Sequence, residues 1–297
     1  MCGIVGLFLK DQTLQPQLGD LLTKMLVTMT DRGPDSAGIA VYAEDHKSGK
    51  ITVQSDSPDT DFAALAAALG QAIEVEVRAR PNDSHCVLEL PAEKLERARD
   101  HLAAQHQDLR IMSFGEALEI YKEVGKPDAV SARFRLDQMS GSHGIGHTRM
   151  ATESAITTDG AHPYNTGADQ CLVHNGSLSN HNALRRSLLR EGMRITSEND
   201  TEVGAAYLTW KMQQGATLGE ALEAGLSDLD GFYTFVVGTR DGFGVLRDPI
   251  ACKPAVLAET ERYVAFGSEY RALVDLPGIE HARVWEPEPA TVYFWTH

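Results

Sequence analysis

Two β-rich stretches separated by a central pair of helices constrain the fold of this chain most strongly. Residues 4–9 and 37–42 are apolar and strand-like, and most of 231–294 is strand-like again. Between them we expect one helix over 180–191 and another opening at Asn199, which a glutamate follows at the spacing of a helix N-terminus. Strands that bracket helices favour two sheets covered by helices over a βαβ repeat. We therefore expect an α+β fold.

The pattern of apolar and charged residues changes over 56–125. Apolar residues alternate with charged ones over 73–77, a second strand-like run follows over 86–90, and a charged helical run occupies 91–105. We interpret 56–125 as a small inserted α/β subdomain within a larger domain that spans 2–297.

Composition excludes several classes of partner. The chain has 297 residues and a net charge of −15, from 42 acidic and 27 basic residues, which opposes binding to nucleic acid or to an anionic membrane surface. No apolar run is long enough to span a bilayer, and the first residues lack the basic region and apolar run of a signal peptide. We expect a cytoplasmic protein. Its four cysteines form no CxxC pair, so neither a disulfide framework nor a zinc site is predicted.

Cys2 has the chemistry of a nucleophile that carries its own base. A small residue at position 2 permits removal of Met1, which leaves Cys2 with a thiol and a free α-amine. An α-amine has a pKa of about 7.7 to 8.0, so it accepts a proton close to neutral pH and activates the thiol. A cysteine at this position is otherwise an ordinary small apolar residue, and the rest of the chain has to decide between the two interpretations.

Four further motifs follow Cys2 along the chain. They are Arg32-Gly33-Pro34-Asp35-Ser36, His147-Thr148-Arg149-Met150-Ala151-Thr152, Leu172-Val173-His174-Asn175-Gly176 and Ser197-Glu198-Asn199-Asp200-Thr201-Glu202. Each is short, but the ordered set resembles the class II glutamine amidotransferases over residues 2 to about 273. The resemblance implies the N-terminal nucleophile hydrolase fold, a four-layer αββα sandwich of two sheets between helices.

The resemblance also implies roles at the reacting end of the substrate. Cys2 corresponds to the nucleophile that attacks the side-chain carboxamide of glutamine and forms a γ-glutamyl thioester. Asn175 and Gly176 correspond to the oxyanion hole, although an Asn-Gly pair by itself indicates a plain turn.

The amino-acid end of glutamine is assigned in the same way. Arg149 is similar to the residue that clamps the α-carboxylate, and Thr152 adds a hydroxyl. Asp200 resembles the acid that holds the α-ammonium, and by itself it would be a helix-terminal aspartate. Arg32 resembles a residue that orders the site near the nucleophile, and a structural arginine in a tight turn is the equal alternative.

The remaining histidines and cysteines are assigned structural roles. His143 and His147 have HxxxH spacing, but the glycines between them argue against a helix, and on a strand they lie too far apart to share a metal. With His162 and His174 they are expected to support the site, and no metal is predicted. Cys86, Cys171 and Cys252 are expected to be packing residues.

The finer resemblance is to free-standing amidotransferase subunits of glutamate-synthase-like systems, including N-methylglutamate synthase. It rests on the run 149–154, on His162-Pro163-Tyr164 and on Arg247-Asp248-Pro249. It implies a hetero-oligomer in which glutamate-synthase-like partner subunits receive ammonia. The resemblance implies no cofactor in this chain, and FMN and an iron–sulfur cluster on the partner subunits.

Two alternatives remain open at this stage. An N-terminal nucleophile hydrolase of another amide would share Cys2 and the fold, but it would not need Arg149 and Asp200 as a clamp. A catalytically silent structural subunit would keep the domain and retain Met1, which would block the α-amine.

Overall fold

A seven-stranded antiparallel sheet forms one half of the molecule. The computed structural model describes residues 2–43, 48–151 and 155–297. In spatial order the strands of this sheet are β15 (Arg283–Trp285), β13 (Val256–Glu259), β14 (Tyr263–Gly267), β1 (Gly3–Leu9), β8 (His143–Arg149), β2 (Ser36–Tyr42) and β7 (Leu118–Val124). The strand that begins directly after Cys2 is thus the central one.

A five-stranded antiparallel sheet packs against the first. Its spatial order is β16 (Thr291–Thr296), β12 (Gly242–Arg247), β11 (Gly231–Thr239), β10 (Gln170–Leu178) and β9 (Tyr164–Gly167). Large apolar side chains of both sheets are buried between them, including Phe8, Ile145, Val173 and Phe243. This shared core joins the two sheets into one body.

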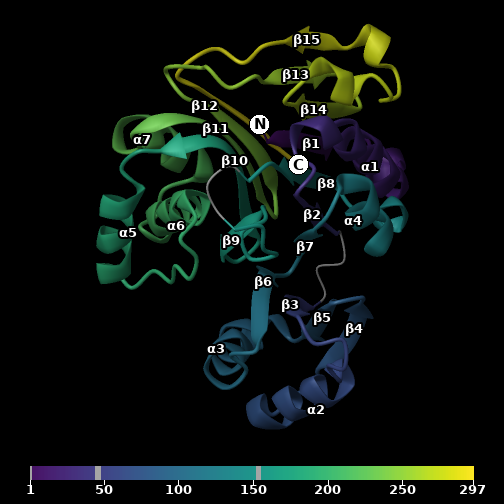
Figure 1. Ribbon diagram of the computed structural model, residues 1–297, viewed down its shortest axis with the longest axis vertical. Coiled ribbons are helices and arrows are strands. Elements are labelled where there is room, and N and C mark those ends of the chain that lie inside the picture. The colour runs from purple at the N-terminus through teal and green to yellow at the C-terminus, as the bar shows by residue number, and fades with distance from the viewer. Residues whose placement is uncertain (1, 44–47, 152–154) are drawn as a thin grey trace.

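Helices cover the outer faces of the two sheets. Beside the seven-stranded sheet lie α1 (Leu18–Thr28) and α4 (Pro127–Arg133), and beside the five-stranded sheet lie α5 (His181–Arg190), α6 (Asp200–Gln213) and α7 (Leu218–Asp228). Figure 1 shows the resulting layers. The predicted four-layer αββα sandwich is confirmed.

A third, four-stranded sheet lies at one end of the sandwich (Figure 1). Its strands are, in spatial order, β4 (Arg78–Asn82), β5 (His85–Leu90), β3 (Gly49–Ser55) and β6 (Leu109–Gly115), and α2 (Phe62–Ile73) and α3 (Leu95–Gln105) pack on it. The sheet begins at Gly49, before the stretch 56–125 that we expected to be inserted. That stretch also contains β7, which belongs to the seven-stranded sheet.

The prediction of a strand over 73–77 is wrong. Ile73 is the last residue of α2, and Glu74 ends the helix in the left-handed conformation with a φ of 62°. The helix begins at Asp61, whose carboxylate accepts hydrogen bonds from the amides of Ala63 and Ala64 at 3.0 and 2.9 Å. An N-cap and an alanine-rich run with one apolar face form a helix here, and the short alternation only marks its end.

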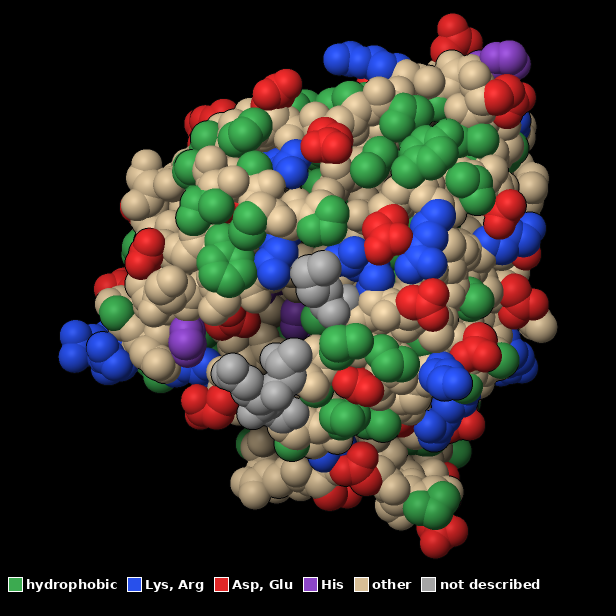
Figure 2. Space-filling model, turned by 45° about the horizontal axis from the view of Figure 1, so that its top comes forward, with side chains coloured by type: hydrophobic (Ala, Val, Ile, Leu, Met, Phe, Trp, Pro, Cys, Tyr) green, Lys and Arg blue, Asp and Glu red, His purple; other side chains and the backbone are tan. Residues whose placement is uncertain are grey.

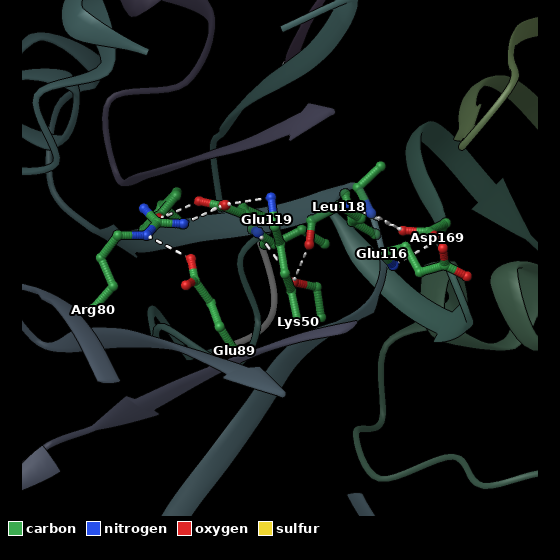
Figure 3. Close-up of polar contacts among 11 residues, drawn as sticks. Lys50, Arg80, Glu89, Glu116, Leu118, Glu119 and Asp169 are labelled. Atoms are coloured by element: carbon green, nitrogen blue, oxygen red, sulfur yellow. Dashed lines mark hydrogen bonds and ion pairs between the residues drawn. The ribbon is translucent and has the colours of Figure 1, made fainter. Parts of the chain in front are cut away.

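Buried polar contacts fix the four-stranded sheet to the sandwich (Figure 3). Glu119 of β7 pairs with Lys50 of β3 at 3.2 Å and with Arg80 of β4. At the turn between β6 and β7, the carboxylate of Asp169 accepts hydrogen bonds from the amides of Glu116, Ala117 and Leu118 at 2.8 to 2.9 Å. Asp169 lies between β9 and β10, so one side chain ties the hairpin to the other sheet.

No helix in the described part of the chain is long and apolar enough to cross a membrane.

Candidate active site

Cys2 lies at the start of the central strand of the seven-stranded sheet. Its Sγ is 3.9 Å from the carbonyl oxygen of Met150, which follows the end of the neighbouring strand β8. Its own carbonyl oxygen accepts hydrogen bonds from Arg32 Nε at 3.0 Å and from Asn175 Nδ2 at 3.2 Å. Because these donors hold the backbone of Cys2 on two sides, the position of the thiol is defined by three separate segments.

Arg32 contacts both Cys2 and an acidic side chain. Besides holding Cys2, its buried guanidinium forms an ion pair with Glu269 at 2.7 Å. The hydrogen bond from Arg32 is the main reason that the pKa of Glu269 lies below its ordinary value. Arg32 is not among the described residues that line the cavity beside Cys2. Its contacts are those of a residue that positions the nucleophile.

Asn175 and Gly176 lie next to each other on β10, close to the nucleophile. Asn175 Nδ2 donates both to Cys2 and to Ser268 Oγ, the latter at 3.2 Å. Gly176 has a φ of 141°, and a Cβ there would meet the carbonyl oxygen of Phe232 at 1.9 Å. Only glycine fits this position, because the neighbouring strand β11 leaves no room for a side chain.

Arg149 ends β8 on one side of the same cavity. Its buried guanidinium donates to the carbonyl oxygen of Ala155 at 3.4 Å. It also lies against Gly160, where a Cβ would be 2.9 Å from Nη1. The turn before the next strand is therefore shaped around this arginine.

Asp200 is the first residue of α6 on the other side. One carboxylate oxygen accepts a hydrogen bond from the amide of Leu178 at 2.9 Å, and the other is 3.6 Å from His174 Nδ1. Asn199 caps the helix by accepting from the amide of Thr201 at 2.9 Å, as the sequence predicted. The carboxylate of Asp200 is thus oriented by two contacts.

One cavity of about 510 Å³ connects these residues. Cys2, Arg149, Gly176 and Asp200 all line it, although they come from four separate segments. Figure 2 shows a hollow near the centre of one face, with a histidine side chain inside it and Lys and Arg side chains near its rim. The volume is in the range of small-molecule sites.

Three buried histidines, His147, His162 and His174, lie beside this cavity. The rings of His147 and His162 are stacked 4.1 Å apart, and Thr201 Oγ1 bridges His162 Nε2 at 3.1 Å and His174 Nδ1 at 3.0 Å. Burial lowers the pKa of His147 to about 3 and that of His162 well below its ordinary value. These rings are neutral at pH 7, and they pack and orient their neighbours. His143 lies elsewhere, stacked on Tyr42.

No group of three or more His, Cys, Asp or Glu side chains among the described residues is arranged to hold a metal ion. Cys86 and Cys171 are buried, whereas Cys252 is exposed and does not pack in the core as expected. Thr152, expected to add a hydroxyl to the substrate clamp, lies outside the described residues, as does Met1.

Ser268 is a site residue that the sequence did not reveal. Its Oγ accepts hydrogen bonds from the amide of Ile4 at 2.9 Å and from Asn175 Nδ2, and its own amide donates to the carbonyl oxygen of Ile4 at 2.9 Å. It therefore links the strand of the nucleophile to Asn175. The only sequence signal is a Gly-Ser-Glu turn after a fully apolar strand, which is too common to be specific.

Comparisons with known proteins identify relatives of this chain. A family model described as a glutamine amidotransferase domain matches residues 147–275. The chain is 64% identical over 298 residues to the glutamine amidotransferase-like protein GlxB of Rhizobium meliloti (strain 1021), with 100% of this chain and 99% of that protein covered. It is also 32% identical over 164 residues to a glutamine–fructose-6-phosphate aminotransferase of Shewanella oneidensis, which covers 50% of this chain and 27% of that enzyme.

A solved structure shares the fold. The glutamine phosphoribosylpyrophosphate amidotransferase of B. subtilis superposes with a TM-score of 0.63 at 19% identity, over 99% of this chain and 47% of that one. The chain thus spans about half the length of that structure.

Proposed function

The chain belongs to the class II glutamine amidotransferases, and from that premise we propose that Cys2, freed by removal of Met1, is its nucleophile. As a member of this family it hydrolyses the side-chain amide of glutamine and transfers the ammonia. What is proposed is the assignment of residues to each step and the nature of the protein that receives the ammonia.

The observation that carries the assignment is that one cavity holds a thiol and charged side chains of both signs. Arg149 and Asp200 line it together with Cys2. The guanidinium suits the α-carboxylate of glutamine because its forked donors match two oxygens, and Asp200 suits the α-ammonium. With its amino-acid end held there, glutamine presents its carboxamide to the sulfur.

The proposed reaction has two balanced steps. The α-amine of Cys2 takes the thiol proton, the sulfur bonds to the carboxamide carbon, and the C–N bond breaks as that proton passes to the leaving ammonia. Asn175 and Gly176 receive the negative oxygen of the tetrahedral intermediate. Water then attacks the thioester and restores the thiol, so that glutamine and water become glutamate and ammonia.

We further propose that a glutamate-synthase-like or N-methylglutamate synthase complex in the cytoplasm receives the ammonia. Ammonia released into water at neutral pH is protonated and is lost as a nucleophile, so a closed path to a partner is required. The relative of Rhizobium meliloti is covered over 99% of its length, which leaves no room in that protein for a fused synthase domain. Purification from the native host is expected to bring along chains that carry FMN and an iron–sulfur cluster.

The nucleophile is tested by replacing its sulfur. Cys2→Ala is expected to abolish release of glutamate from glutamine, measured with glutamate dehydrogenase, while Cys252→Ala at the exposed cysteine leaves it unchanged. Intact-mass measurement of the active protein is expected to show loss of Met1. An active preparation that retains Met1 would rule out the α-amine as base.

The clamp is tested by changing the shape of one group and the charge of the other. Arg149→Lys and Asp200→Asn are each expected to raise the KM for glutamine by about 10- to 100-fold, because each removes a charge-assisted contact to the amino-acid end. Arg78→Lys and Asp241→Asn are matched controls at side chains that are 75% and 76% exposed. Unchanged glutamine kinetics in both clamp variants would favour a hydrolase of another amide.

A further inference from the structure

Lys122 is a buried cation that none of the steps above uses. It lies on β7, is 4% exposed, and projects toward the segment that runs from Asp159 to Tyr164. Its Nζ donates to the carbonyl oxygens of Ala161 at 2.8 Å, of Asp159 at 3.3 Å and of Pro163 at 3.3 Å. It also lies 4.3 Å from the centre of the Tyr164 ring. One ammonium group thus holds three carbonyl oxygens of one short segment and a ring face.

The segment that Lys122 holds is a wall of the glutamine cavity. Asp159, Gly160, His162 and Tyr164 all line that cavity. At Gly160 the backbone comes so close to Arg149 that a Cβ would lie 2.9 Å from the guanidinium. The Tyr164 hydroxyl donates to the carbonyl oxygen of Asp159 at 2.9 Å and closes the segment on itself. Movement of this wall would therefore change the space around Arg149.

We propose that Lys122 is a positioning residue for glutamine recognition, which holds the wall 159–164 against Arg149 and so sets the affinity for the amino-acid end. The inference rests on the proposed clamp role of Arg149. Lys122 does not line the cavity itself, so it acts through the wall and not on the substrate. Because β7 pairs with β2 at the edge of the seven-stranded sheet and continues into the β6–β7 hairpin, the wall is anchored to the scaffold.

Charged groups from several elements surround Lys122. Burial lowers its pKa to about 8, Asp159 and Glu202 favour its charged form, and Arg110 and Arg149 oppose it. His162 and His85 also lie within its electrostatic reach. Since the ammonium donates three hydrogen bonds and the neutral amine only two, the wall is held best below pH 8 and less firmly above it.

The test compares two buried lysines. Lys122→Met keeps the aliphatic chain and removes the donors, and it is expected to raise the KM for glutamine about tenfold at pH 7 with kcat changed less than twofold. Lys50→Met is the matched control, because Lys50 is equally buried but pairs with Glu119 at the other end of β7 and contacts no part of the wall. It is expected to leave both constants unchanged.

The pH profile separates positioning from general weakening of the fold. The ratio of the KM of Lys122→Met to that of the wild type is expected to shrink at least threefold between pH 7 and 9.5, as the wild type loses its ammonium. A ratio that stays constant with pH, or a fall in kcat without a rise in KM, would overturn the proposal.

Two further results keep the inference separable from the proposed function. If Lys122→Met yields no folded protein by circular dichroism, Lys122→Gln, which keeps one N–H donor group on a shorter chain, takes its place, and a KM for glutamine equal to that of the wild type at pH 7 overturns the role. If Arg149→Lys leaves glutamine kinetics unchanged, the clamp has failed, whatever Lys122 does. With a valid clamp, Lys122→Met in the Arg149→Lys background is expected to add less than a threefold further rise in KM.

Discussion

Asn175 has a single side-chain nitrogen that donates to both Cys2 and Ser268. This shared contact brings together the strands β1, β10 and the end of β14, which are far apart in the sequence. The nucleophile, its neighbouring amide and the glycine beside it therefore keep their relative positions before any substrate arrives. Both hydrogens of Nδ2 are engaged in these contacts, so the proposed oxyanion role of Asn175 requires one of them to turn to the substrate oxygen as the intermediate forms.

Removal of the Asn175 side-chain amide is expected to lower kcat and to leave the KM for glutamine less affected. Asn175→Ala should lower kcat for glutamine hydrolysis by about 100- to 1,000-fold, because one oxyanion donor is lost. Steady-state kinetics with glutamine checks the prediction, and Asn180→Ala at the exposed start of α5 serves as the control. A loss confined to KM would assign Asn175 to substrate binding.

At this scale the sequence predicted the residues that carry recognisable motifs. The structure brings Cys2, Arg149, Gly176 and Asp200 to one cavity, whereas Arg32 and Asn175 do not line it. Ser268 and Glu269 could not be predicted, because their roles arise only where β14 pairs with β1 across more than 250 residues of chain. The role of Lys122 could not be predicted either, since a lysine in an alternating strand normally faces solvent.

Among the elements, the β6–β7 hairpin has the most specific anchor. The carboxylate of Asp169 accepts from three successive amides at its turn, and the backbone of Asp169 also donates to the carbonyl oxygen of Phe114 at 3.0 Å. Buried amides without partners are costly, so this turn depends on one side chain from the other sheet.

Loss of that carboxylate is expected to destabilise the fold. Asp169→Ala should lower the free energy of unfolding by about 2 to 5 kcal/mol, because it leaves buried amides unpaired. Urea unfolding followed by circular dichroism measures this. Asp241→Ala, in the turn between β11 and β12, is the control and should change stability by less than about 0.5 kcal/mol. Equal changes in the free energy of unfolding for the two variants would show that the hydrogen bonds to the Asp169 carboxylate do not stabilise the fold.

Helices and strands were predicted correctly where an apolar pattern extended over many residues or a motif fixed its boundary, as for β1, β2 and α5. The helix α2 was missed because the alternation over 73–77 has the period of a strand, whereas the N-cap at Asp61 and the alanine-rich run decide the outcome. The beginning of the four-stranded sheet at Gly49 was also missed. The attachment of this sheet to the sandwich depends on tertiary contacts such as Glu119 with Lys50, which no local pattern shows.

Across the whole molecule, buried neutral histidines link stability to pH. Burial lowers the pKa of His85, His143 and His147 to about 3 each. The unfolded chain, with ordinary pKa values of about 6.5, therefore binds more protons between pH 6.5 and 3. The stability that these rings contribute is fully present above pH 6.5 and is lost as the pH falls toward 3.

Acid titration is expected to show this loss. Each histidine contributes about 1.4 kcal/mol per pH unit, so the three together give a slope of about 4 kcal/mol per unit below pH 6. Urea unfolding at a series of pH values measures the slope. His143→Gln should reduce the slope by about 1.4 kcal/mol per pH unit, whereas His281→Gln, at a side chain that is 83% exposed, should not. A stability that stays level from pH 7 to 5 would contradict the prediction.

The central position of β1 has a consequence for the biosynthesis of the protein. Residues 3–9 are made first, but their partners on both sides, β8 and β14, begin only at His143 and Tyr263. At about 5 to 20 residues per second, the ribosome takes on the order of tens of seconds to complete these partners. Until then the start of the chain stays unpaired and open to enzymes. If Met1 is excised as proposed above, we expect the excision to take place in this interval, before β1 pairs with its neighbours.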